Sequence, residues 1–114
     1  MIKIEATTAQ KREIRQSINQ LAAYATKQHE SRLNKAAFNN VVREIRQKVK
    51  GKKSSFSLSP SCVLQLMPVV AMVAFCADFV KMYKQAPKLT GNLMHSLIIL
   101  EQKILIPAVP QLKN

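Results

Sequence analysis

The feature that most constrains this chain is an apolar stretch, residues 62–80, in which apolar side chains occupy nearly every position around a helix. Ser59 and Pro60 precede it, and this pair is typical of a helix start, with serine as N-cap and proline at N1. A helix that is apolar on all sides lies at the centre of a bundle or is covered by partner chains. Pro68 falls inside it and predicts either a kink or a split into two shorter helices.

The same stretch approaches the length of a membrane-spanning helix, which needs about 20 apolar residues. It contains Gln65, Pro68 and Asp78, however, and such groups are costly inside a bilayer. We therefore expect a buried helix and no membrane association. Cys62 and Cys76 would lie about 21 Å apart along this helix, too far for a disulfide, and no signal peptide pattern is visible. These observations predict a reduced, cytoplasmic protein.

The first half of the chain, residues 1–53, predicts two amphipathic helices. Thr7 and Gln10 match a capping box, so the first helix is expected to begin at Thr7 and to end near residues 28–30. A second helix is expected over residues 32–50, with Gly51 as its C-terminal cap. Apolar residues at spacings of three and four line each helix: Ile14, Ile18, Leu21 and Ala25 in the first, and Phe38, Val41, Val42, Ile45 and Val49 in the second.

The second half, residues 54–114, is predicted to complete the bundle. Thr90 is expected to cap a last helix that Pro107 ends. No convincing strand is found, although Leu97–Leu100 and Ile104–Ile106 have apolar runs that a strand also shows. With 114 residues, 47% apolar residues and only two glycines, the chain predicts a single all-α domain, a compact bundle of four to five helices.

Charge is distributed unevenly between the two halves. Eighteen Lys and Arg face six Asp and Glu, a net charge of +12. Thirteen of these cations and four of the acids lie in residues 1–53, which therefore carry +9, while residues 54–114 carry +3. A solvated surface needs no such excess, so we expect binding to a polyanion. The candidate nucleic-acid-binding residues are Lys11, Arg12, Arg15, Arg43, Arg46, Lys48, Lys50, Lys52 and Lys53.

Aromatic residues that would stack on bases are scarce, with four Phe and two Tyr. Contacts to the phosphate backbone without sequence specificity are therefore expected, with a steep dependence on salt. The sequence leaves open whether the ligand is DNA or RNA, and whether it is single or double stranded. His29 and His95 have no Cys, Asp or Glu neighbour at ligand spacing, and no glycine-rich phosphate loop is present. We expect no enzymatic activity, no metal and no cofactor.

Two segments resemble the small subunit of CRISPR effector complexes of the Cascade and Csm type. The opening Ala6-Thr7-Thr8-Ala9-Gln10, followed by Ile14, Ser17, Ile18 and Leu21, is similar to the "TTxQ" first helix of some members. Leu66-Met67-Pro68-Val69-Val70-Ala71 is similar to their Leu-x-Pro-x-x-Ala stretch, although Met72 and Phe75 follow where a tyrosine and an arginine are frequent. The resemblance implies a non-catalytic subunit of a ribonucleoprotein assembly. It would contact crRNA-paired target or displaced DNA strand, and pack against other subunits and copies of itself.

A second resemblance is to the core histone fold. Residues 37–45 are similar to its first helix, Phe56 stands before a long central helix, and Lys88-Leu89-Thr90 resembles the second DNA-contacting loop. This resemblance implies DNA packaging by obligate dimers. A third hypothesis, from another class, is a helical adaptor or inhibitor that binds an acidic protein.

Overall fold

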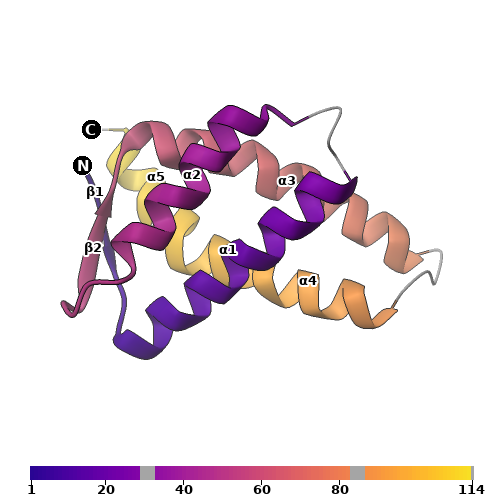
Figure 1. Ribbon diagram of the computed structural model, residues 1–114, viewed down its shortest axis with the longest axis horizontal. Helices are drawn as coiled ribbons and strands as arrows, with labels where there is room; N and C mark the ends of the chain where they lie inside the picture. Colours follow the sequence, from indigo (N-terminus) through magenta and orange to yellow (C-terminus); the bar gives the residue numbers. More distant parts are fainter. Residues whose placement is uncertain (29–32, 83–86, 114) are drawn as a thin grey trace.

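The computed structural model describes the backbone of residues 1–28, 33–82 and 87–113, and the side chains within residues 1–27, 33–75 and 92–113. In these ranges the chain is the predicted all-α bundle, with an additional two-stranded sheet at one end (Figure 1). The elements in order are β1 (Ile2–Glu5), α1 (Thr8–Gln28), α2 (Lys35–Lys48), β2 (Ser55–Leu58), α3 (Pro60–Met82), α4 (Pro87–Leu100), the π-helical turn η2 (Glu101–Leu105) and α5 (Ile106–Leu112).

The predicted caps of α1 and α3 are confirmed. The main-chain N–H of Thr7 donates to Oε1 of Gln10 at 2.8 Å, and that of Gln10 donates back to Oγ1 of Thr7 at 3.2 Å. At the start of α3, Oγ of Ser59 accepts from the N–H of Cys62 at 3.1 Å. Each cap satisfies N–H groups that the first turn of a helix leaves without partners.

Helix α2 is shorter than the sequence predicts. It begins at Lys35 because Asn34 is its N-cap, with Oδ1 accepting from the N–H three residues on at 3.2 Å. It ends at Lys48, and Val49 is the C-cap in a right-handed conformation. Gly51 does not adopt a left-handed φ, so the predicted glycine cap is wrong. The buried side chain of Val49 holds the chain against the core instead.

The two strands were not predicted. β1 pairs with β2 in antiparallel register, with Ile2 opposite Leu58 and Ile4 opposite Phe56, and these four side chains are buried. Alternation of apolar and polar residues is the signal of a half-buried strand, and both segments show it. The segments that resembled strands in the sequence, Leu97–Leu100 and Ile104–Ile106, are helical.

Helix α3 continues through Pro68 as one helix, so the predicted alternative of a split is wrong. A proline inside a helix removes one N–H and leaves the carbonyl four residues earlier, here that of Leu64, without its partner. Both Pro68 and Leu64 are exposed, so water can satisfy that carbonyl.

The C-terminal helix also differs from the prediction. α4 begins at Pro87, so Thr90 lies inside it, and the helix continues past Pro107 into α5. The turn η2 makes this continuation possible, because the N–H of Ile106 donates to the carbonyl of Glu101 five residues earlier. Gln111 then ties α5 to β1: its Oε1 accepts from the N–H of Lys3 at 2.9 Å, and its Nε2 donates to the Lys3 carbonyl at 2.8 Å.

The C-terminal stretch Asn92–Leu112 is, among the described helices, the one long and apolar enough to cross a bilayer by length and composition. A helix buried in the core of a globular protein passes the same test. Side chains such as Leu97 and Leu100 are buried against the rest of the bundle.

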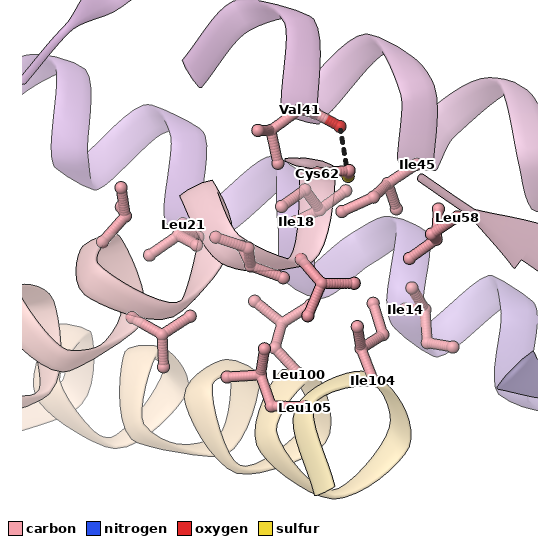
Figure 2. Close-up of a cluster of buried hydrophobic side chains, with 14 of the residues drawn as sticks. Ile14, Ile18, Leu21, Val41, Ile45, Leu58, Cys62, Leu100, Ile104 and Leu105 are labelled. Atoms are coloured by element: carbon pink, nitrogen blue, oxygen red, sulfur yellow. Dashed lines mark hydrogen bonds between the residues drawn. The ribbon is translucent and has the colours of Figure 1, made fainter. Parts of the chain in front are cut away.

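Side chains from both halves of the chain form a single core cluster (Figure 2). The fully buried members include Ile14, Ile18 and Leu21 of α1, Val41 and Ile45 of α2, Leu58 of β2, and Leu100 and Ile104 of the C-terminal helix. Residues 1–53, which carry most of the positive charge, therefore pack against residues 54–114. The cations lie on the surface of α1 and α2 that faces away from this core.

Candidate nucleic-acid interface

Lys11 does not lie on the surface where the sequence analysis expected it. Only 3% of the residue is exposed. Its ammonium group donates to the carbonyl of Gly51 at 2.7 Å and to the carbonyl of Lys53. A buried ammonium needs partners of this kind, and these two carbonyls occupy it. We therefore remove Lys11 from the candidate phosphate ligands, because it holds the turn after α2 against the first turn of α1.

Helix α1 separates its charges between two sides. At 3.6 residues per turn, Arg12, Arg15 and Asn19 fall on one side, and Glu13 and Gln20 fall on another. Gln20 marks the side toward α4, because its Oε1 accepts from Oγ of Ser96 at 2.8 Å. The two exposed arginines therefore lie away from α4.

A side-chain hydrogen bond shows that this arginine side of α1 meets α2. Nε of Arg46 donates to Oδ1 of Asn19 at 2.6 Å. Arg43 and Arg46 are three residues apart and share one side of α2, and Lys50, two residues past the end of the helix, lines the same surface concavity as both. The cations of the two helices therefore border the same seam, and Asn19, which the sequence analysis did not single out, lies at its centre.

Lys48 departs from the other candidates on α2. It follows Glu44 by four residues and shares its side of the helix. Glu44 faces the start of α3, where its carboxylate accepts from the N–H of Ser59 at 2.7 Å and from its Oγ at 2.9 Å. Lys48 therefore projects on the side of α2 opposite Arg43, Arg46 and Lys50.

Lys52 and Lys53 are exposed in the turn that follows α2. The hydrogen bonds of Lys11 place this turn beside the start of α1. We call the resulting surface the basic face and define it by seven exposed residues: Arg12, Arg15, Arg43, Arg46, Lys50, Lys52 and Lys53.

An open concavity of about 500 Å³ lies on the α2 part of the basic face. Its polar lining combines cations with amide side chains, which donate hydrogen bonds to phosphate oxygens without adding negative charge. The lining residues are Asn39, Val42, Arg43, Arg46, Gln47 and Lys50. Asn39 and Gln47 were missed by the sequence analysis, although their helical spacing to the arginines was available as a signal.

The acids whose side chains are described lie elsewhere. Glu13 is on the α4 side of α1, Glu44 is bonded to Ser59, and Glu101 belongs to η2. Glu5, at the end of β1 opposite Ser55, is the described acid nearest the turn of Lys52 and Lys53. In the described part of the chain no carboxylate is bonded to a cation of the basic face, so its charge stays available to an anionic ligand.

The histidine and cysteine side chains form no metal or nucleophilic site in the described part of the chain. His95 is exposed on α4, while His29 and Cys76 lie outside the described side chains. Among the described residues no three His, Cys, Asp or Glu side chains are grouped as metal ligands. Burial raises the pKa of the Cys62 thiol to about 12, helped by the neighbouring Glu44 carboxylate. A thiol with so high a pKa is a poor nucleophile at neutral pH.

No protein-family model, no curated protein and no solved structure matches this chain. The resemblances to CRISPR small subunits and to core histones therefore depend on the quoted residues alone. The histone resemblance assigns Lys88-Leu89-Thr90 to a loop, whereas these residues lie in α4.

Proposed function

We propose that this chain is a non-catalytic protein that binds the phosphate backbone of a nucleic acid through the basic face. One observation carries the proposal: seven exposed cations from α1, α2 and the following turn share one surface, while the described acids lie beside or away from it. A surface of this kind attracts a polyanion at long range and displaces its condensed counterions on contact.

The lack of exposed aromatic side chains on this face supports backbone contact without sequence specificity, as far as the described side chains extend. The role suggested by the CRISPR resemblance, a subunit of a larger ribonucleoprotein assembly, is compatible with such a face. In that setting the exposed apolar side chains of α3 would meet protein neighbours, and the basic face would meet the nucleic acid.

A charge-matched pair of double variants tests the proposal. Arg43→Ala/Arg46→Ala removes two cations from the basic face, and Lys48→Ala/Lys113→Ala removes two exposed cations from outside it. Binding of a fluorescein-labelled duplex is followed by anisotropy between about 50 and 200 mM KCl, where backbone binding varies most steeply. The first variant should lose affinity for all sequences equally and flatten the salt slope by about 2, and the control should keep both values near wild type.

Equal losses in the two variants would mean that net charge alone is responsible and would contradict the assignment of the basic face. Absence of binding by the wild-type protein to duplex and single-stranded probes at low salt would refute the proposed function. In that case, binding to an acidic protein instead would favour the adaptor hypothesis.

A further inference from the structure

Resting on the proposed function, we infer that the basic face binds a double helix in preference to a single strand. The first reason is its arrangement in two rows. Arg12 and Arg15 of α1 form one row, and Arg43, Arg46 and Lys50 form the other; Lys52 and Lys53 extend the first from the turn that Lys11 holds against the start of α1. α1 and α2 pack side by side and run in opposite directions (Figure 1).

The two rows lie on either side of the seam between α1 and α2, where Arg46 reaches Asn19. A double helix presents two phosphate chains along the edges of each groove. One chain can contact the α1 row while the other contacts the α2 row. A single strand that follows one row leaves the cations of the other without phosphate partners.

The second reason is that the helices and the turn that carry the two rows are held in place before any ligand binds. Arg46 is bonded to Asn19 across the seam, and the ammonium of Lys11 anchors the turn that carries Lys52 and Lys53. Beneath the seam, Val42 of α2 and Ile18 of α1 are buried in the common core. A fixed backbone beneath the cations binds a stiff duplex without ordering the ligand, whereas a flexible single strand must be ordered on the face at a cost in conformational entropy.

The third reason is the absence of a stacking platform among the described side chains. Proteins that bind single strands without sequence preference stack bases on aromatic side chains, at about 1–3 kcal/mol per base. Here Phe38 and Phe56 are buried, Tyr24 packs against the core, and the exposed Phe75 belongs to α3 rather than to α1 or α2. The basic face therefore offers cations and amide donors but no stacking surface. A duplex can contact both rows of cations with its phosphates, whereas a single strand contacts only part of them.

The test compares a labelled DNA duplex of about 20 base pairs, the RNA duplex of the same sequence and oligo(dT) of the same length, by anisotropy across the same salt range. At equal phosphate concentration a duplex should bind at least about tenfold more tightly than oligo(dT). Its salt slope should approach about 6 if all seven cations contact phosphates, against about 2 to 3 for a single strand on one row. The two duplex arms show whether the groove geometry of DNA or of RNA fits the rows better.

Two row variants complete the test. Arg12→Ala/Arg15→Ala and Arg43→Ala/Arg46→Ala should each lower the duplex slope by about 2, and Lys48→Ala should leave it unchanged. Oligo(dT) binding as tightly as the duplexes would overturn this inference and leave the proposed function intact. A duplex slope that responds to one row only would overturn the two-row arrangement. Failure of all three probes to bind would instead refute the proposed function.

Discussion

Replacing Lys11 by methionine tests whether this lysine is a structural residue or a phosphate ligand. Methionine keeps most of the side chain's length and apolar stem, so the substitution removes the ammonium without opening a large cavity. Two carbonyls, those of Gly51 and Lys53, lose their donor. A hydrogen bond to a charged group contributes about 1.5–3 kcal/mol, but this turn is exposed enough for water to replace part of the loss.

We therefore expect Lys11→Met to lower the free energy of unfolding by about 2–3 kcal/mol. For a domain of this size the melting temperature should fall by about 10 °C. Circular dichroism measures it, and urea unfolding gives the free energy directly. Arg12→Met is the matched control, because it removes the adjacent, exposed cation of the basic face. It should change stability by less than about 0.5 kcal/mol and reduce affinity for nucleic acid.

The reasoning would be refuted if Lys11→Met melted with the wild-type protein and lost affinity as much as Arg12→Met. Such a result would mean that the ammonium faces solvent and contacts phosphate. The opposite pattern, stability lost in the first variant and affinity in the second, would separate the two neighbouring cations by function.

Two further predictions concern other parts of the molecule. Folding raises the thiol pKa of Cys62 from 9.0 to about 12, because the thiol is buried. The folded state therefore favours the protonated thiol, and this contribution to the free energy of unfolding is complete below pH 9 and is lost as the pH rises toward 12. The urea concentration at the midpoint of unfolding should therefore fall more between pH 8 and pH 10 for the wild type than for Cys62→Ala. An equal fall in the two proteins would contradict the buried position of the thiol. On α3, Leu64 is 57% and Phe75 is 75% exposed, so Leu64→Ser/Phe75→Ser should reduce concentration-dependent association in light scattering without lowering the melting temperature. If the wild-type chain stays monomeric at high concentration, the exposed apolar side chains of α3 do not mediate association.

Local patterns in the sequence predicted much of the helical framework. The capping box at Thr7, the start at Ser59-Pro60 and the apolar spacing of α1 and α2 depend on residues within one or two turns of each other. Such signals are read correctly because the hydrogen bonds they report are local. The helix split at Pro68 and the helix end at Pro107 were predicted wrongly, because Pro68 and Leu64 are both exposed and because the π turn before Pro107 lets the helix continue.

The candidate interface was predicted in part. The sequence identified the cations but not which of them share a surface, because that depends on the angle of each residue around its helix and on which neighbours cover it. Asn19, Asn39 and Gln47 carry no charge, so a search for cations passed over them. The short sheet was missed because each strand has only four residues, and paired residues of the two strands lie 50 to 56 positions apart in the sequence.

By itself, the sequence determined that this chain forms helices around an apolar centre and that its first half carries the positive charge. Both properties follow from composition and local periodicity. Only the tertiary structure decided the roles of individual cations. It buried Lys11 against carbonyls 40 and 42 residues away, joined Glu44 to Ser59 and joined Arg46 to Asn19. The physical reason is that burial and pairing of a charge depend on chain segments that meet only after folding.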